Sequence, residues 1–142
     1  MKISTVLSTK GANVITIRPE QSVREVIALF LQYNIGALVV VDAAGAVAGL
    51  IAERDIVRGL ARAPDILAQP VSAVMARDVI AVSPQDDVVS VMQTMTEKRL
   101  RHLPVLEQDQ LTGIISIGDI IKIQLDEYQG EVETLETQIT EG

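Results

Sequence analysis

The sequence predicts an α+β fold, in which two pseudo-symmetric β-α-β-β-α repeats pack sheet to sheet and an extended C-terminal helix follows. An internal repeat is the first reason: Pro84 lies 65 positions after Pro19 and, after one deletion in a turn, Asp119 lies 64 positions after Asp55. Short aliphatic runs are the second reason, because they are typical of strands buried on both faces. A unit of this size cannot easily bury its own sheet, so the two copies should pack together around a pseudo-twofold axis.

The first repeat is expected at residues 14–61, after an N-terminal segment at residues 1–13. Its predicted elements are a strand at 14–17, a helix from a capping box at Ser22 to about Asn34, strands at 37–41 and 47–51 around a turn at 42–45, and a helix at 53–60. The first helix has one apolar face, which predicts that it covers the sheet. This face consists of Val23, Val26, Ile27, Phe30 and Leu31.

A linker with a short helical piece is expected at residues 62–77, and the second repeat at residues 78–123. The predicted elements of this repeat are a strand at 79–82, a helix capped by Asp87, a strand at 103–106, and a strand that runs into a helix start within 111–122. Asp87 takes the position of Ser22, so the helix cap is repeated as well.

Residues 124–142 are predicted to form an amphipathic C-terminal helix. Apolar residues spaced by four and three positions make a heptad stripe, interrupted by Gly130 at a cost of about 1 kcal/mol. The stripe consists of Ile121, Leu125, Tyr128, Val132, Leu135 and Ile139. Two interpretations remain open: the stripe reinforces a homodimer, or the helix lies along its own domain.

The composition restricts the core and the partners. With one Phe, two Tyr and no Trp in 142 residues, the core must be aliphatic, and aromatic platforms for single-stranded nucleic acid are excluded. The net charge of −7 disfavours nucleic acid and anionic membranes as partners. The chain has no cysteine, which excludes disulfides and zinc sites built on sulfur. The first residues contain no apolar run of the length of a signal peptide, so a cytoplasmic protein is expected.

Ser116 and Asp119 stand where the last predicted strand meets a helix start. A carboxylate in the first helical turn is stabilised by the helix dipole and stays ionised. Its two oxygens can accept both hydroxyl protons of a ribose. Ser-x-x-Asp is also a capping-box signature, and the two roles are compatible. We therefore consider this pair both as a helix cap and as candidate ribose ligands.

Three basic residues, Arg99, Arg101 and His102, precede one of the predicted strands. In the first repeat, Gly36 and Ala37 stand in place of Arg101 and His102, so the basic pair occurs only in the second repeat. A guanidinium matches phosphate oxygens, and an imidazole can assist when it is protonated, which favours a phosphate-binding end. A solvated charged face and a structural histidine are the alternatives.

Four motifs together carry a family resemblance: VITIRP at 14–19, IGALVVVD at 35–42, RHLPV at 101–105 and GIISIGD at 113–119. In this order they resemble a tandem pair of cystathionine-β-synthase (CBS) domains, over about residues 8–122. The resemblance implies a stand-alone pair, or Bateman module. Such modules bind adenosine-containing ligands such as AMP, ATP, NAD(H) or S-adenosylmethionine, sense rather than catalyse, and commonly associate as dimers.

The resemblance also implies roles for the candidate residues. The ligand ribose would lie against Ser116 and Asp119, and the phosphate near Arg101 and His102, with Arg99 close by. The adenine would lie against the segment before the first strand. Backbone groups of residues 10–15 would contact its edge, and Val14 and Ile15 would give apolar walls to the ring. The residues of this segment are Lys10, Gly11, Asn13, Val14 and Ile15.

A second, pseudo-symmetric cleft is implied around Asp55. Its residues would be Asp55, Arg54, Asp78, Val79 and Ile80. Ala52 stands where the first cleft has the hydroxyl of Ser116. We therefore expect the Asp119 cleft to be the better adenosine site and the Asp55 cleft to be weaker.

These observations predict a homodimeric, non-enzymatic sensor that binds AMP, or alternatively NAD(H) or ATP, between the two repeats and regulates an unidentified protein. We expect no catalytic residue, no catalytic cofactor and no metal. The alternative is a structural dimerisation or adaptor module whose clefts are vestigial. An enzyme is disfavoured because the sequence has no Walker loop, nucleophile elbow, metal cluster or cysteine–histidine pair.

Overall fold

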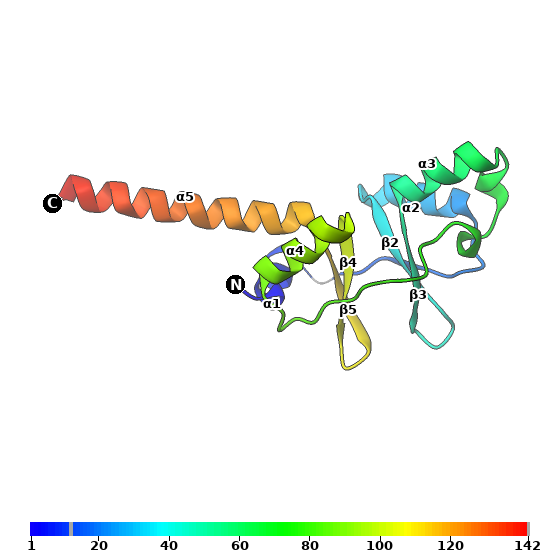
Figure 1. The fold of residues 1–142 in the computed structure, drawn as a ribbon, viewed down its shortest axis with the longest axis horizontal. Helices are drawn as coiled ribbons and strands as arrows, with labels where there is room; N and C mark the ends of the chain where they lie inside the picture. The colour runs from blue at the N-terminus through cyan, green and yellow to red at the C-terminus, as the bar shows by residue number, and fades with distance from the viewer. Residues whose placement is uncertain (12, 142) are drawn as a thin grey trace.

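The computed structural model describes residues 1–11 and 13–141, and these residues form the predicted α+β fold with a long C-terminal helix (Figure 1). The elements are α1 (Ile3–Lys10), β1 (Thr16–Ile17), α2 (Val23–Tyr33), β2 (Ala37–Val41), β3 (Val47–Ala52), α3 (Glu53–Arg62), the 3-10 helices η1 (Ile66–Ala68) and η2 (Val71–Ala73), α4 (Val88–Lys98), β4 (His102–Glu107), β5 (Gln110–Ser116) and α5 (Ile117–Glu141).

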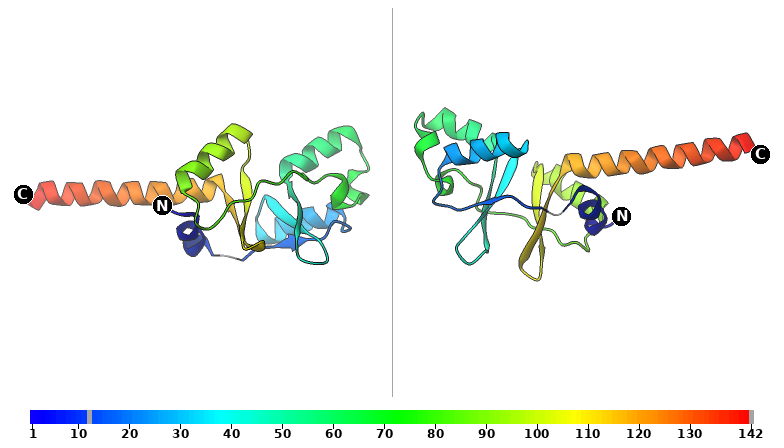
Figure 2. Two further views of the ribbon diagram at one scale, coloured as in Figure 1. Left: turned by 60° about the horizontal axis from the view of Figure 1, so that its bottom comes forward. Right: turned by 180° about the vertical axis from the view of Figure 1, so that it is seen from behind.

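Two β-hairpins stand next to each other in the middle of the molecule, with helices on the outer sides (Figures 1 and 2). Strand β1 pairs parallel with β2, and β2 pairs antiparallel with β3. Strands β4 and β5 form the second hairpin. The register shifts between Val40 and Val41 in the first hairpin and between Val105 and Leu106 in the second, which are equivalent positions of the repeat. The repeat seen in the sequence is therefore a repeat of backbone geometry.

The predicted strand at 79–82 is wrong, because this segment contributes only one bridge residue, Val82. The Val82 N–H donates to the Pro104 carbonyl (3.0 Å), and the Val82 carbonyl accepts from the Leu106 N–H (2.8 Å). Extending this parallel ladder towards Ile80 would need an N–H on Pro104, which proline lacks. Its counterpart in the first repeat is Val39, which has an N–H, and there β1 pairs over two residues.

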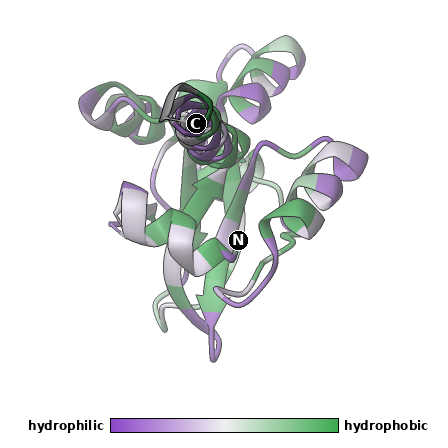
Figure 3. Cartoon of the chain, turned by 90° about the vertical axis from the view of Figure 1, so that its left-hand side faces the viewer, coloured by the Kyte–Doolittle hydropathy of each residue, from purple (hydrophilic) through white to green (hydrophobic). Residues whose placement is uncertain are grey.

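Each half of the molecule has its own apolar core, and the strands that carry the two cores are the most apolar part of the chain (Figure 3). The segment before each repeat crosses to the core of the other half. Ile3 and Val6 of α1 are fully buried in the core of the second repeat, where the Ile3 N–H donates to the Asp86 carbonyl (3.0 Å). Val71 and Met75 of the linker are buried in the core of the first repeat.

Both predicted helix caps form, with one half of the predicted capping box at Ser22, where Glu25 Oε2 accepts from Gln21 Nε2 (2.7 Å). The apolar face of α2 is narrower than expected. Ser22 Oγ accepts from the Glu25 N–H (3.2 Å), and Asp87 Oδ2 accepts from the Val89 N–H (3.0 Å). The predicted burial of Leu31 is wrong, since this side chain is 79% exposed. It lies about 80° around the helix from Val23, at the edge of the buried stripe.

Helix α5 leaves the body of the molecule and projects into solvent (Figures 1 and 2). Its first turns are anchored by Ile120, which is fully buried, and by Ile123, which packs against the second core. Further along, the apolar side chains are mostly exposed, as Leu125 and Leu135 show. The interpretation that this helix lies along its own domain is therefore wrong. None of the described helices combines the length and the hydropathy that crossing a membrane requires.

Candidate functional site

The site begins at the junction between β5 and α5, where Ser116 and Asp119 form a reciprocal capping box. The Asp119 N–H donates to Ser116 Oγ (3.0 Å), and the Ser116 N–H donates to Asp119 Oδ2 (2.9 Å). Each side chain satisfies a backbone donor that the helix start leaves without an intrahelical partner. The capping interpretation is confirmed, and the cap holds the carboxylate in a fixed position.

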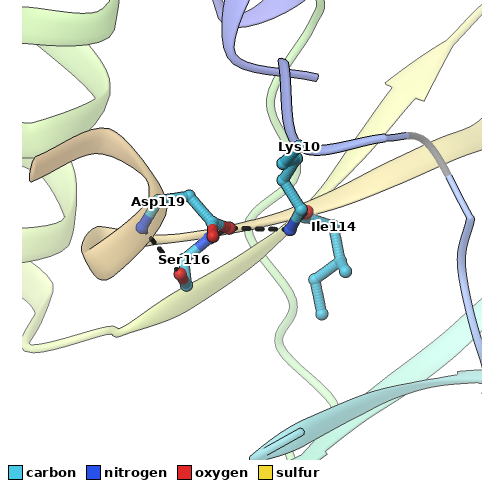
Figure 4. Close-up of polar contacts among 4 residues, drawn as sticks. All are labelled: Lys10, Ile114, Ser116 and Asp119. Carbon is cyan, nitrogen blue, oxygen red and sulfur yellow. Dashed lines mark hydrogen bonds and ion pairs between the residues drawn. The ribbon is translucent and has the colours of Figure 1, made fainter. Parts of the chain in front are cut away.

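Lys10 reaches this carboxylate from the end of α1 (Figure 4). Its Nζ donates to Asp119 Oδ2 (2.6 Å) and to the Ile114 carbonyl (2.7 Å). The two side chains of this ion pair are 28% and 26% exposed, so solvent reaches both. Gly11 follows Lys10 with a φ of 93°, a conformation that glycine adopts at little cost, and there the chain leaves α1.

A cavity of about 240 Å³ lies in front of the ion pair, and both repeats contribute to its wall. The end of α2 and the start of β2 form one side, and β4, β5 and the start of α5 form the other. The lining residues are Lys10, Asn34, Ile35, Gly36, Ala37, His102, Ile114, Ser116 and Asp119. A small molecule in this cavity would contact both halves of the fold.

The carboxylate and the imidazole in this wall have shifted pKa values. Burial alone would raise the pKa of Asp119, but the hydrogen bonds from Lys10 and from the Ser116 N–H outweigh it and lower this pKa. Burial lowers the pKa of His102; the charge of Asp119 opposes this shift, and the charges of Lys10 and Arg101 add to it. At neutral pH the site therefore holds an ionised Asp119 and a neutral His102, which offers a hydrogen bond rather than a charge.

The structure brings together four of the predicted site residues: Lys10, His102, Ser116 and Asp119 line the same cavity. For Lys10 we expected only backbone contacts, and its side chain is the part that reaches the site. Asn34 and Ile35 were missed by the sequence analysis. The repeat contained a signal for Asn34, because Asn34 and Arg99 are equivalent residues with left-handed backbones that end α2 and α4.

Arg99 and Arg101 are exposed and are not among the residues that line this cavity. The repeat explains their position. Their equivalents in the first repeat, Asn34 and Gly36, line the cavity beside Asp119, so the two arginines belong beside the equivalent Asp55. Arg54, the neighbour of Asp55, donates from Nη2 to the Arg99 carbonyl (2.9 Å), in agreement with this placement. A phosphate-binding role for either arginine stays a prediction.

The segment expected to hold an adenine runs between the two halves. Gly11 and Asn13 are exposed, and Val14 and Ile15 are half-buried. Ile15 packs against the core of the first repeat. Ala12 lies outside the described residues. The predicted contacts of this segment with a ligand stay predictions.

The second cleft, around Asp55, keeps one of the two hydrogen bonds of the cap and lacks the hydroxyl and the ammonium of the first cleft. Asp55 Oδ2 accepts from the Ala52 N–H (2.9 Å), as Asp119 does from Ser116. Met75 occupies the position equivalent to Leu7, since the two side chains are buried against the equivalent glycines Gly49 and Gly113, where an added Cβ would lie 2.6 Å and 2.7 Å from them. Asp78 then takes the position of Lys10. The other residues predicted for this cleft are exposed Arg54 and Asp78 and half-buried Val79 and Ile80.

Comparison with known proteins identifies the domain type. A family model described as CBS domain matches residues 3–62 and 71–126. The chain is 32% identical over 149 aligned positions to the mitochondrial CBS domain-containing protein CBSX3 of Arabidopsis thaliana, covering 99% of this chain and 72% of that protein.

Solved structures share the fold over most of their length. The CBS-domain containing protein ATU1752 of Agrobacterium tumefaciens superposes with a TM-score of 0.84 and 38% identity, covering 87% of this chain and 99% of that one. The CBS domain pair of protein MJ0100, solved in complex with 5′-methylthioadenosine and S-adenosyl-L-methionine, has a TM-score of 0.80 and 23% identity, covering 89% of this chain and 98% of that one.

Proposed function

The chain belongs to the CBS domain family, and we propose that it is a non-enzymatic sensor that binds an adenosine-containing ligand in the Asp119 cavity. AMP is the ligand that we propose first, with NAD(H) or ATP as alternatives. The observation that carries this proposal is a cavity built from both repeats, with a fixed carboxylate, a hydroxyl, an ammonium and an imidazole in its wall.

The carboxylate of Asp119 suits the ribose of such a ligand. Its Oδ2 already accepts from the Ser116 N–H and from Lys10, whereas its Oδ1 has no hydrogen bond within the described residues. Because the pKa of Asp119 is lowered, the group is an ionised acceptor at neutral pH. An ionised carboxylate forms charge-assisted hydrogen bonds with hydroxyl donors, so the ribose hydroxyls are the groups that we propose for this position.

The fold of the MJ0100 pair supports the class of ligand. That protein was solved with two adenosine derivatives, 5′-methylthioadenosine and S-adenosyl-L-methionine. The two molecules share the adenosine moiety and carry no phosphate. A cavity that selects the adenosine moiety therefore needs groups for the ribose and the base first, and the phosphate contributes only where a cation meets it.

The position of the cavity gives a route from binding to a signal. Gly36 and Ala37 belong to the first repeat, whereas Ser116 and Asp119 belong to the second. A ligand that contacts both sides binds most tightly to one relative arrangement of the repeats and shifts the population towards it. We propose that this shift is what the regulated protein detects.

Calorimetric titration with AMP, ATP, NAD⁺, NADH and S-adenosylmethionine tests the proposed function. We expect at least one of them to bind at submillimolar concentration. The absence of binding by all five at millimolar concentration would refute an adenosine sensor. The small molecules that copurify with the chain, identified by mass after denaturation, give an independent answer.

A structural dimerisation module is the second candidate, favoured by the loss of polar groups from the Asp55 cleft. Ala52 and Asp78 take the positions of Ser116 and Lys10, so this cleft lacks the hydroxyl and the ammonium of the Asp119 cleft. If both clefts are vestigial, nucleotide at millimolar concentration leaves the melting temperature unchanged, because a ligand that does not bind the native state cannot stabilise it.

Replacing Lys10 with methionine should raise the affinity for adenosine relative to the affinity for AMP. In the free protein the ammonium holds the carboxylate that we assign to the ribose. Adenosine should bind several-fold more tightly to the variant, since it no longer competes with Lys10. AMP should gain less or bind more weakly, because its phosphate loses the one permanent cation among the residues that line this cavity. Calorimetry with both ligands gives the ratio of their affinities.

Lys2→Met is the matched control for this experiment. Lys2 precedes the same helix at its other end, and its Nζ donates to Gln85 Oε1 (3.0 Å), away from the cavity. The control variant should keep both affinities. If Lys10→Met changes the two affinities by the same factor, the ammonium does not distinguish phosphate from nucleoside and its assigned role is wrong.

A further inference from the structure

Helix α5 carries an apolar stripe that the body of the molecule does not cover. The stripe residues Leu125, Tyr128, Leu135 and Ile139 are all more than half exposed. Together with Ile121 and Val132 they follow the spacing of the a and d positions of a coiled coil. Two-stranded coils bury this kind of stripe against a second helix, so the stripe needs one partner helix of similar length.

The stripe is symmetric about its own centre, Gly130. If a second copy of α5 lies antiparallel with Gly130 opposite Gly130, every stripe residue meets another stripe residue. The pairs are then Ile121 with Ile139, Leu125 with Leu135, and Tyr128 with Val132, each occurring twice. An antiparallel pair therefore buries the whole stripe without leaving an apolar residue unpaired.

The charges beside the stripe distinguish the two possible directions. Lys122 is the sole basic residue of α5, and every other charged residue of the helix is acidic. In a parallel pair, Glu131 of each copy faces Glu136 of the other across the edge of the stripe. Two pairs of like charges then lie side by side. In the antiparallel pair, Lys122 of each copy faces Glu136 of the other, which gives two pairs of opposite charge. The one pair of like charges is Glu131 facing Glu131 of the second copy.

The same charges argue against a lipid surface as the occupant. Interfacial helices that bind membranes carry lysine and arginine beside the apolar face, whereas this helix carries acids there. An anionic bilayer would repel them. A second copy of this chain supplies an apolar stripe of the same length and places a basic residue, Lys122, beside the acidic flank.

We propose that α5 is a dimerisation arm, and that two copies of the chain join through an antiparallel pairing of these helices centred on Gly130. The two bodies then lie at opposite ends of the paired helices, and the cavity residues Ser116 and Asp119 precede the first paired residue, Ile121. This proposal does not depend on the proposed ligand, because it rests only on residues of α5 after Asp119.

Single-cysteine variants test the direction of the pairing, because the natural chain has no cysteine. Leu125→Cys and Leu135→Cys chains are made separately, one with a mass tag, and mixed in a glutathione redox buffer. A disulfide forms only between cysteines whose Cα atoms lie within about 7 Å. We expect disulfides between the two different variants and none within either variant alone. Thr134→Cys, which lies on α5 outside the stripe, gives the background for random collisions.

Sedimentation equilibrium supplies the second measurement. Leu135→Glu should weaken dimerisation by about a hundredfold, since each dimer loses two buried leucine contacts, while Thr134→Glu should leave the dissociation constant unchanged. Disulfides within the Leu125→Cys variant alone would show a parallel pair and overturn the proposal. No disulfide above background in any mixture, or an equal effect of the two glutamate substitutions, would overturn it as well.

Discussion

Replacing Asp119 with alanine is expected to weaken binding of the adenosine ligand by about tenfold to a hundredfold. A hydrogen bond to a charged group contributes about 1.5–3 kcal/mol, and every 1.4 kcal/mol is about tenfold in affinity. The variant removes the acceptor that we assign to the ribose, and it also releases Lys10 from its ion pair. Calorimetric titration with the ligand that binds the natural chain measures the loss.

Asp55→Ala separates this loss from the loss of a helix cap. Both carboxylates accept the backbone N–H three residues earlier, from Ala52 in one repeat and from Ser116 in the other. Each alanine should therefore lower the free energy of unfolding by about 1 kcal/mol. Only Asp119→Ala should change the affinity of the ligand at the Asp119 cavity. If the two variants lose affinity equally, the carboxylate acts through the fold and does not touch the ribose.

Much of the fold could be predicted because its signals are local and occur twice. Ser22 and Asp87 cap equivalent helices, and the apolar runs at 37–41 and 47–51 form strands with nearly those bounds. The predicted strand at 79–82 failed for a reason that lies elsewhere in the sequence. Pro104, on the neighbouring strand, lacks the N–H that a longer ladder would use.

The cap at the centre of the candidate site could be predicted because its residues are close in sequence. Ser116 and Asp119 are three residues apart, and their capping box follows from that spacing. Lys10 is 109 positions from Asp119 and meets it because α1 packs on the second repeat rather than on the first. No local sequence pattern indicates that α1 packs on the second repeat. The sequence signal for this packing is the similarity between α1 and the linker helix η2, each of which precedes one of the two repeats.

The crossing of α1 predicts a large loss of stability from a substitution near the start of the chain. Ile3→Ala should lower the free energy of unfolding by about 2–5 kcal/mol, the usual cost of truncating a fully buried isoleucine. Ile3 is completely buried among residues of the second repeat, including Val88 and Ile120. Urea denaturation followed by circular dichroism measures the change.

Leu31→Ala is the control for this substitution, because it also truncates a large aliphatic side chain within a helix. Leu31 is 79% exposed, so its truncation should change the free energy of unfolding by less than about 0.5 kcal/mol. A loss for Ile3→Ala as small as that for Leu31→Ala would mean that α1 is a peripheral segment in solution. In that case Lys10 would not be held at Asp119, and the ion pair in the cavity wall would lose its structural basis. A loss of the expected size would instead show that the first helix of the chain is part of the core on which the Asp119 site is built.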